Sequence, residues 1–318
     1  MFRMPRLRIA TVFSLAIVSM LAAGHVSFAQ EAFETFKQLN SSTKMPKIKA
    51  FTAPDPAALA AMTQTRSVKL EAKLTDKAPP MNAGLSWRVF SPIPGSDGKL
   101  PLLASAEGGS ADFQLAPGDY FVNVSFGRAG ATKKLTVAVD KDVDTQVMVL
   151  NAGGLSLSAT SGTDTQISDK QLTFDIYSSE MAENGERRLM LADIRPNTIV
   201  RLNAGTYHVV SEYGSINAVV RADIKVEAGE LTEATIQHRA SQVSFKLVSD
   251  EGGEAIADTA WSIVTSGGDI VAESVSAFPV MVLSEGQYTA IARNKDEIFQ
   301  KDFEVVAGVN QDVELLLD

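Results

Sequence analysis

Apolar and polar side chains alternate along most of the chain after residue 66. Clear examples are LSWRVF (85–90), LTFDIY (172–177) and TAWSIV (259–264). A period of two places one side of a strand on a core and the other side in water. Clusters of Gly, Pro, Asn, Asp and Ser separate these short runs, and no long helical period occurs among them. The pattern therefore predicts antiparallel β-sandwiches rather than βαβ units.

One motif, Leu-x-x-Gly-x-Tyr, occurs three times, at 115–120, 202–207 and 283–288. An aromatic residue precedes each copy on an alternating run, and an alternating run follows each copy. Such recurrence in one order predicts three copies of a single structural unit. The corresponding landmarks are Leu115, Leu202 and Leu283; Gly118, Gly205 and Gly286; Tyr120, Tyr207 and Tyr288; Trp87, Phe174 and Trp261; and Val139, Val226 and Val305.

The motif suits a corner that closes a sandwich. Glycine adopts positive φ without the cost that other residues incur, so it can lead the chain into a strand. The Tyr can bury its ring while its hydroxyl finds a backbone partner, as in the tyrosine corner of immunoglobulin-like folds. The Trp, Phe and Trp residues are expected to fill the space between two sheets. Near the end of the first unit, the same alternation places Leu135, Val137, Val139, Val147 and Val149 on the core face.

The recurrence divides the chain into a leader, an extension and three repeats. The first 29 residues combine a basic start, an apolar run and the small residues of SFA, which predicts a signal peptide cleaved after Ala29. An uncleaved anchor is the alternative, although the apolar run is shorter than the roughly 20 residues of a spanning helix. The predicted segments are a signal peptide (1–29), a partly ordered N-terminal extension (30–65) and β-sandwich repeats at 66–151, 152–240 and 241–318.

Composition narrows the chemistry further. The chain has no cysteine, so its repeats need neither disulfides nor thiolate metal sites. The formal net charge of −9 is unlike that of a nucleic-acid-binding protein, which neutralises phosphates with a basic face. No segment after the leader is apolar enough to span a membrane as a helix. We therefore expect a periplasmic protein, with secretion as the alternative.

The repeated unit resembles the tandem β-sandwich modules of bacterial envelope proteins, namely PEGA-type domains and carboxypeptidase-regulatory (transthyretin-like) domains. The resemblance is carried by LAPGDYFVNV (115–124) and LNAGTYHVVS (202–211), and more weakly by LSEGQYTAIA (283–292). It implies an immunoglobulin-like or transthyretin-like fold and a role at the cell surface. It transfers no active site.

Catalytic and metal-binding patterns are sparse. His208 and His238 have no matching His or Cys near them in sequence, and no Gly-x-Ser-x-Gly elbow is present. Asp140, Asp142 and Asp144 could bind calcium through oxygen ligands, but a solvated turn is the simpler interpretation. Tyr177 and Tyr213 are candidates for exposed rings that bind a glycan, against the alternative of ordinary surface tyrosines. No cofactor is expected.

These observations favour a non-enzymatic envelope protein that acts as a spacer or binding module for another periplasmic component. The alternative is a polysaccharide-binding accessory of a carbohydrate-active or hydrolytic exported system. The partner is therefore expected to be an envelope protein or a glycan. Because the repeated motif builds a core, we expect specific function in the parts that differ, namely the predicted loops at 91–114, 178–201 and 265–282 and the N-terminal extension.

Overall fold

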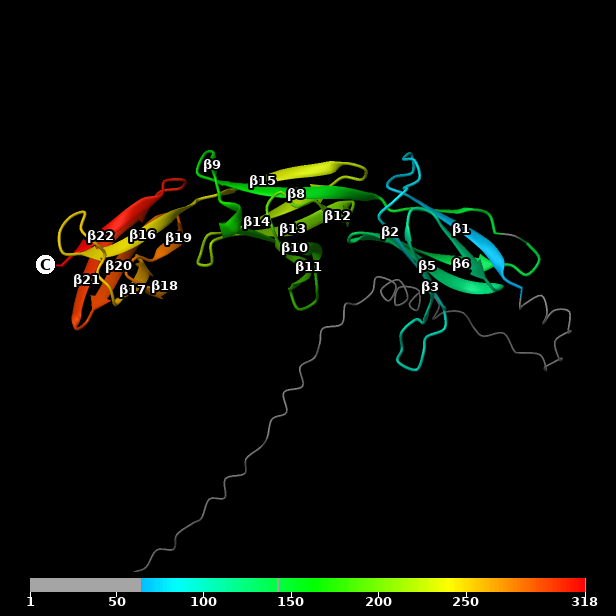
Figure 1. Ribbon diagram of the computed structural model, residues 1–318, viewed down its shortest axis with the longest axis horizontal. Helices are drawn as coiled ribbons and strands as arrows, with labels where there is room; N and C mark the ends of the chain where they lie inside the picture. Colours follow the sequence, from blue (N-terminus) through cyan, green and yellow to red (C-terminus); the bar gives the residue numbers. More distant parts are fainter. Residues whose placement is uncertain (1–63, 142, 318) are drawn as a thin grey trace, which may run out of the picture. The chain divides into compact units, whose positions relative to one another are not determined.

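The computed structural model describes residues 64–141 and 143–317 (Figure 1). Within these residues the chain forms 22 strands and one short 3₁₀ helix. The strands build six sheets, a three-stranded and a four-stranded sheet in the first and third repeats, and two four-stranded sheets in the second. The predicted signal peptide and nearly all of the predicted N-terminal extension lie outside the described residues. The protein is thus an all-β protein of tandem β-sandwiches.

The first repeat contains strands β1–β7. Their bounds are β1 (Arg66–Lys73), β2 (Leu85–Phe90), β3 (Leu102–Gly108), β4 (Ala111–Leu115), β5 (Gly118–Phe126), β6 (Ala129–Val137) and β7 (Gln146–Val149). One sheet has the order β4-β1-β7 and the other the order β3-β2-β5-β6. Trp87 is fully buried in the core, and its indole Nε1 donates to the carbonyl oxygen of Gly109 at 2.7 Å.

The second repeat contains strands β8–β15 and the 3₁₀ helix. The bounds are β8 (Ala152–Ser161), β9 (Thr165–Gln166), η1 (Asp169–Gln171), β10 (Leu172–Met181), β11 (Arg187–Ile194), β12 (Val200–Asn203), β13 (Gly205–Tyr213), β14 (Val219–Val226) and β15 (Leu231–His238). One sheet has the order β12-β8-β15, with β9 added to β8, and the other the order β11-β10-β13-β14. Phe174 is fully buried in the core.

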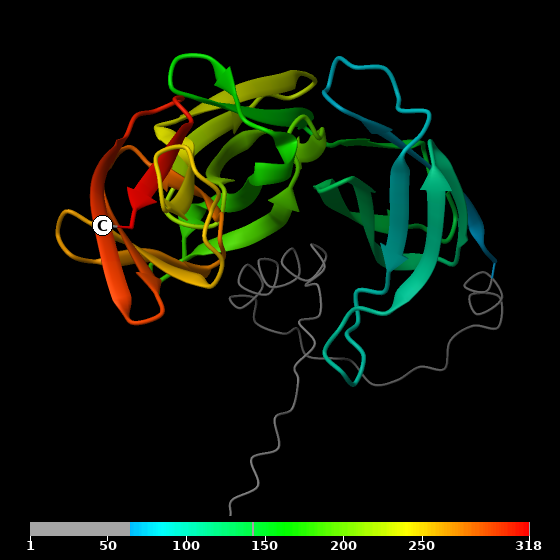
Figure 2. The same cartoon turned by 60° about the vertical axis from the view of Figure 1, so that its left-hand side comes forward.

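The third repeat contains strands β16–β22, drawn from yellow to red in Figure 2. Their bounds are β16 (Ala240–Val248), β17 (Thr259–Thr265), β18 (Ile270–Val275), β19 (Val280–Ser284), β20 (Gly286–Asn294), β21 (Glu297–Val305) and β22 (Gln311–Leu316). The sheets have the orders β19-β16-β22 and β18-β17-β20-β21. Trp261 packs against Phe245 in this core, with ring centroids 5.6 Å apart.

Strand pairing is antiparallel except at one place in each repeat. The first strand of each repeat runs parallel to the last: β1 to β7, β8 to β15 and β16 to β22. The sequence predicted antiparallel strands. The alternation of apolar and polar residues cannot reveal that one pair in each repeat is parallel. Strand direction depends on how many times the chain crosses between the sheets, which alternation does not record.

The repeated corner has the same geometry in all three repeats. Gly118, Gly205 and Gly286 have φ values of 157°, 156° and 156°, a region essentially restricted to glycine. Each Tyr hydroxyl donates to the carbonyl oxygen four residues earlier, at 2.7 to 2.9 Å. Each Leu of the motif is buried in a core. The corner residues are Leu115, Gly118 and Tyr120; Leu202, Gly205 and Tyr207; and Leu283, Gly286 and Tyr288.

The place of Val139 differs from the sequence-based expectation. Val137, not Val139, corresponds to Val226 and Val305, because Gly118 pairs with Val137 as Gly205 pairs with Val226. Val139 lies beyond β6 and is 37% exposed. A shift of two residues preserves the alternation, so the pattern could not detect it.

The core face of β7 was also predicted in the wrong phase. Val147 is 41% exposed, whereas Met148 and Leu150 are buried. The stretch VMVL is apolar at every position, so either phase satisfies a period of two.

The three predicted loops contain strands β3 and β4, β11 and β12, and β18 and β19. The outer strands of these hairpins, β3, β11 and β18, bury few side chains and so lack a clear alternation.

Side chains of the second repeat join it to the first. The Asn203 amide nitrogen donates to the carbonyl oxygens of Gly130 (3.1 Å) and Leu150 (2.7 Å). Its amide oxygen accepts from the backbone N–H of Gly130 at 3.1 Å. The guanidinium of Arg201 lies 4.5 Å from the centre of the Phe126 ring. One asparagine therefore satisfies three backbone groups at this joint.

An asparagine also connects the second repeat to the third. The Asn217 amide oxygen accepts from the backbone N–H of Ser284 (2.9 Å), and its nitrogen donates to the Tyr288 hydroxyl (3.0 Å). Val282 is buried with the core of the second repeat, while Ile216 packs against the core of the third. Both joints thus combine specific hydrogen bonds with side-chain packing.

Candidate functional site

The outer face of the β11-β10-β13-β14 sheet carries a row of side chains unlike those of the cores. On β10, Phe174 and Ile176 point inward, so Asp175 and Tyr177 lie on the outer face. Tyr177 pairs with Leu189 on β11 and with His208 on β13, and His208 pairs with Asp223 on β14. The register therefore brings an aromatic ring, an imidazole and a carboxylate together across three adjacent strands.

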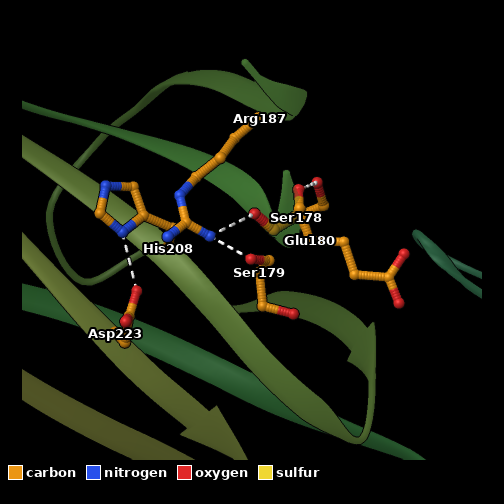
Figure 3. Close-up of polar contacts among 6 residues, drawn as sticks. All are labelled: Ser178, Ser179, Glu180, Arg187, His208 and Asp223. Atoms are coloured by element: carbon orange, nitrogen blue, oxygen red, sulfur yellow. Dashed lines mark hydrogen bonds and ion pairs between the residues drawn. The ribbon is translucent and has the colours of Figure 1, made fainter. Parts of the chain in front are cut away.

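His208 is held in place by its two neighbours in this row. Its Nδ1 lies 2.7 Å from a carboxylate oxygen of Asp223 (Figure 3). The side chains of His208 and Asp223 are 19% and 57% exposed. The Tyr177 ring meets the His208 ring edge to face, with centroids 6.5 Å apart. The Asp223 carboxylate and the Tyr177 ring together orient the imidazole.

Arg187, at the start of β11, is anchored to β10 at one end of this face. Its Nη1 donates to the carbonyl oxygen of Ser179 and, more distantly, to that of Ser178 at 3.5 Å (Figure 3). The hydroxyl of Ser178 in turn donates to the carbonyl oxygen of Glu180. The guanidinium is therefore fixed by backbone acceptors rather than by a carboxylate.

These side chains border a hollow of about 460 Å³. Its lining residues are Tyr177, Gly185, Glu186, Arg187, His208, Val210, Glu212 and Arg221. The pKa of Tyr177 is raised above 10.0, first by partial burial and then by the carboxylates of Asp175 and Glu212, while Arg221 acts in the opposite direction. The Tyr177 hydroxyl makes only a long contact, 3.4 Å, with Asp175. A ring and several charged groups thus share one hollow.

His238 ends β15 in the other sheet of this repeat and lies in the core, on the inner side of β13. It is fully buried, and its Nε2 is 2.7 Å from the hydroxyl of Ser211, a core-facing residue of β13. Its Nδ1 has no hydrogen-bond partner among the described residues. Burial lowers the pKa of His238 from 6.5 to about 4. His238 is thus neutral at physiological pH.

The two histidines divide the parts of a Ser-His-Asp arrangement between two faces of β13. His208 has a carboxylate partner, and His238 has a hydroxyl partner. Across residues 64–141 and 143–317, no hydroxyl is hydrogen-bonded to His208 and no carboxylate to His238. A nucleophilic triad needs all three groups in one hydrogen-bonded line. Neither histidine is placed for that chemistry.

The other sequence candidates are not brought together with this hollow. Asp142 lies outside the described residues, while Asp140 and Asp144 lie between β6 and β7. Within the described parts of the chain, no group of three His, Cys, Asp or Glu side chains is placed to hold a metal ion. Tyr213 was expected to be an exposed ring, but it ends β13 and is 6% exposed. Its position in the inward phase of β13 buries the ring against His238.

Sequence reasoning identified Tyr177 and His208 singly but not their partners. Glu212 and Asp223 occupy the outward phase of β13 and β14, and Arg187 and Arg221 come from two different strands. Alternation could have assigned the strand residues to the outer face. Only the strand order and register place them around one hollow.

The described residues contain no helix that is long and apolar enough to cross a membrane.

Part of the chain is similar to a known domain family. Residues 242–317, which lie in the third repeat, match the Rhizobiales growth-associated tandem repeat domain. No curated protein matches the chain. The fold is that of a tandem β-sandwich protein, and one of its repeats resembles a described tandem repeat domain.

Solved structures that match the chain include a Bacillus anthracis protein and two streptococcal pilins. The Bacillus anthracis TIE protein is 15% identical over 80% of this chain, with a TM-score of 0.25, and this chain covers 50% of its length. The streptococcal ancillary pilin is 12% identical over 80% of this chain and 99% of its own, with a TM-score of 0.26. The minor pilin of Streptococcus agalactiae is 12% identical over 54% of this chain and 95% of its own, with a TM-score of 0.28.

Proposed function

We propose that this is a non-enzymatic, exported envelope protein that acts as a spacer and binding module for another periplasmic component. The hydrogen-bonded joints between the repeats are the main support. Asn203 and Asn217 each satisfy backbone or hydroxyl groups of the neighbouring repeat. A module that only needed a flexible chain of domains would not require these contacts.

The energetics of the joints favour stiffness. A hydrogen bond contributes about 1 kcal/mol net, and separating a joint leaves its partners partly unsatisfied. Acting together, these contacts therefore oppose bending of the joint by roughly a few kcal/mol. They are the three hydrogen bonds of Asn203 and the contact between Arg201 and Phe126. A connection of this kind holds binding surfaces at a defined separation.

The site of action that we propose is the periplasm. It follows from the predicted signal peptide (1–29), cleaved after Ala29. We place the mature repeats at 66–151, 152–240 and 241–318, preceded by the extension at 30–65. The match of the third repeat to a growth-associated domain makes the growing envelope the first place to look for a partner.

A polysaccharide-binding role is the second candidate, and the hollow on the second repeat favours it. An aromatic side chain, Tyr177, lies among polar groups that can bind hydroxyls. A pull-down from periplasmic extract, run beside a glycan-binding screen, would separate the two candidates. Specific protein partners without glycan retention support the first, and glycan retention without protein partners supports the second.

Distance measurements between repeats test the spacer directly. The chain lacks cysteine, so two introduced cysteines can be labelled without background. Exposed positions on different repeats are Asp112 and Glu233. We expect a narrow distance distribution that broadens in Asn203→Ala. Asn184→Ala is the matched control, because its contacts stay within one turn. A distribution equally broad in all three proteins would contradict the spacer.

A further inference from the structure

We propose that the hollow on the outer face of the second repeat binds a neutral, polyhydroxylated ligand, such as an uncharged stretch of envelope polysaccharide. This inference rests on the proposed binding function and assigns it a ligand class and a location. The site is the set of residues around Tyr177, between Arg187 on β11 and Arg221 on β14.

Charge balance in the hollow argues against a strongly charged ligand. Its lining contains two arginines, Arg187 and Arg221, and two carboxylates, Glu186 and Glu212. The imidazole of His208 is hydrogen-bonded to Asp223. The equal numbers of opposite charges in the lining attract neither polyanions nor polycations strongly, and the neighbouring carboxylates of Asp175 and Asp223 further disfavour a polyanion. Selectivity must therefore come from hydrogen bonds and contact with the ring.

Several of these polar groups have hydrogen-bonding capacity to spare. The side chains of Arg221 and Glu212 make no hydrogen bond or ion pair with any residue that the structure describes. Arg187 uses only Nη1, so donors on its Nε and Nη2 are free of described partners. A guanidinium only donates and a carboxylate only accepts. A ligand that satisfies both must carry donors and acceptors side by side, as two neighbouring hydroxyls do.

The apolar part of the hollow complements the C–H face of a sugar ring. Tyr177 and Val210 supply apolar surface between the charged groups. The edge contact with His208 holds the Tyr177 ring, so less side-chain entropy remains to be lost on binding. The weak 3.4 Å contact with Asp175 leaves the Tyr177 hydroxyl able to bond a ligand. The hollow lies within the usual range for small-ligand sites, about 300–1,000 Å³.

The corresponding face of the third repeat differs and provides an internal control. Val264 occupies the position of Tyr177, and Ile291 that of Val210, as counted from the shared aromatic and glycine landmarks. The hollow there is about 620 Å³ and is bordered by Val275 and Ile298, whose exposures are 82% and 68%. It contains no aromatic ring, so the same sugar should not bind there.

Nuclear magnetic resonance titration of the full chain tests the proposal. The neutral probe is the N-acetylglucosamine tetramer, with maltotetraose as a second neutral sugar. Tetragalacturonate is the anionic probe, and tetraserine is the peptide probe. We expect a neutral sugar to bind weakly, with a Kd of about 1 mM, and to shift the amide signals around Tyr177 and His208. Tyr177→Ala and Glu212→Gln should each weaken binding about tenfold, a change of about 1.4 kcal/mol.

Glu273→Gln, on the third repeat, is the matched control and should leave binding unchanged. Its carboxylate borders the hollow that lacks the ring. A narrower spread of amide signals in Tyr177→Ala would indicate that this variant is not properly folded. In that case the affinity of Glu212→Gln alone tests the proposal, because this change removes the charge of an exposed side chain and hardly alters its volume. Amide spectra of each variant report folding independently of binding.

Three results would overturn the inference. They are tighter binding of tetragalacturonate or tetraserine, shifts confined to the third repeat, and no shift with either neutral sugar up to about 10 mM. The proposed function fails separately, because its tests are the distance distribution across the joints and the capture of a periplasmic component. A stiff chain that captures a protein but ignores neutral sugars would refute only the ligand class.

Discussion

Acid should destabilise the second repeat selectively, because of one buried imidazole. His238 stands where the first repeat has Leu150: each lies two residues before the first strand of the next repeat. The imidazole is fully buried, bonded only to Ser211 and packed against the Tyr213 ring. The nearby ion pair of Arg239 and Glu285 lies at the surface of the joint and has no net charge. The neutral form of His238 is therefore the one that fits the fold.

The sign and size of the effect follow from the two pKa values. Burial lowers the pKa of folded His238 from 6.5 to about 4, so the unfolded chain binds a proton first as pH falls. The free energy of unfolding is unaffected above pH 6.5 and decreases progressively between 6.5 and about 4. At 1.36 kcal/mol per unit, the loss is roughly 3 kcal/mol. That is a large part of the about 5–15 kcal/mol that typically stabilises a domain.

The perturbation is His238→Leu, which installs the residue found in the first repeat. At neutral pH the change should be small, about 1 kcal/mol, because the Ser211 hydroxyl loses its partner while the unpaired Nδ1 disappears. Urea unfolding is followed by pulsed hydrogen exchange on peptides 205–213 and 219–226. These peptides report the second repeat, which tryptophan fluorescence cannot do, since Trp87 and Trp261 lie in the other two.

Comparing the two proteins at about pH 7.5 and pH 4 isolates the imidazole, because the carboxylates that titrate below pH 5 are common to both. The natural chain should lose roughly 3 kcal/mol more than the variant on acidification. His208→Leu is the control, and it should retain the excess loss. Equal losses in the natural chain and in His238→Leu would refute the reasoning.

Three further substitutions test the architecture by chemical denaturation. Gly205→Ala should destabilise the second repeat by about 1–3 kcal/mol, since φ is 156° there although the new Cβ meets no atom within 4 Å; an unchanged midpoint would contradict this. Tyr207→Phe should cost about 1 kcal/mol by removing the 2.8 Å bond to the Asn203 carbonyl oxygen, and a neutral result would mean that water replaces it. Trp261→Ala should cost about 3–5 kcal/mol and unfold the third repeat first, which peptides from the other repeats would show by keeping their protection.

The candidate site shows where sequence reasoning reached its limit. Tyr177 was identified as outward-facing because it follows Phe174 and Ile176 in an odd phase. Tyr213 was expected to be an exposed ring, yet β13 extends to it and its inward phase buries the ring. His208 and Asp223 are 15 residues apart in the chain and meet only because β13 and β14 pair in one register.

The sequence by itself determined the threefold recurrence and most of the core strands with their inward faces, because alternation and glycine conformation are local properties. It also determined the corner, since Leu-x-x-Gly-x-Tyr contains the carbonyl acceptor and the hydroxyl donor within one turn. Only the tertiary structure decided which strands pair, that the first and last strands of each repeat run parallel, and that Asn203 and Asn217 bridge the joints. Only the tertiary structure places His208 and His238 on opposite faces of β13, and only it brings Arg187, Glu212 and Arg221 close to Tyr177. The pairing of strands depends on strand order and register, and the alternation of apolar and polar residues carries no information about either.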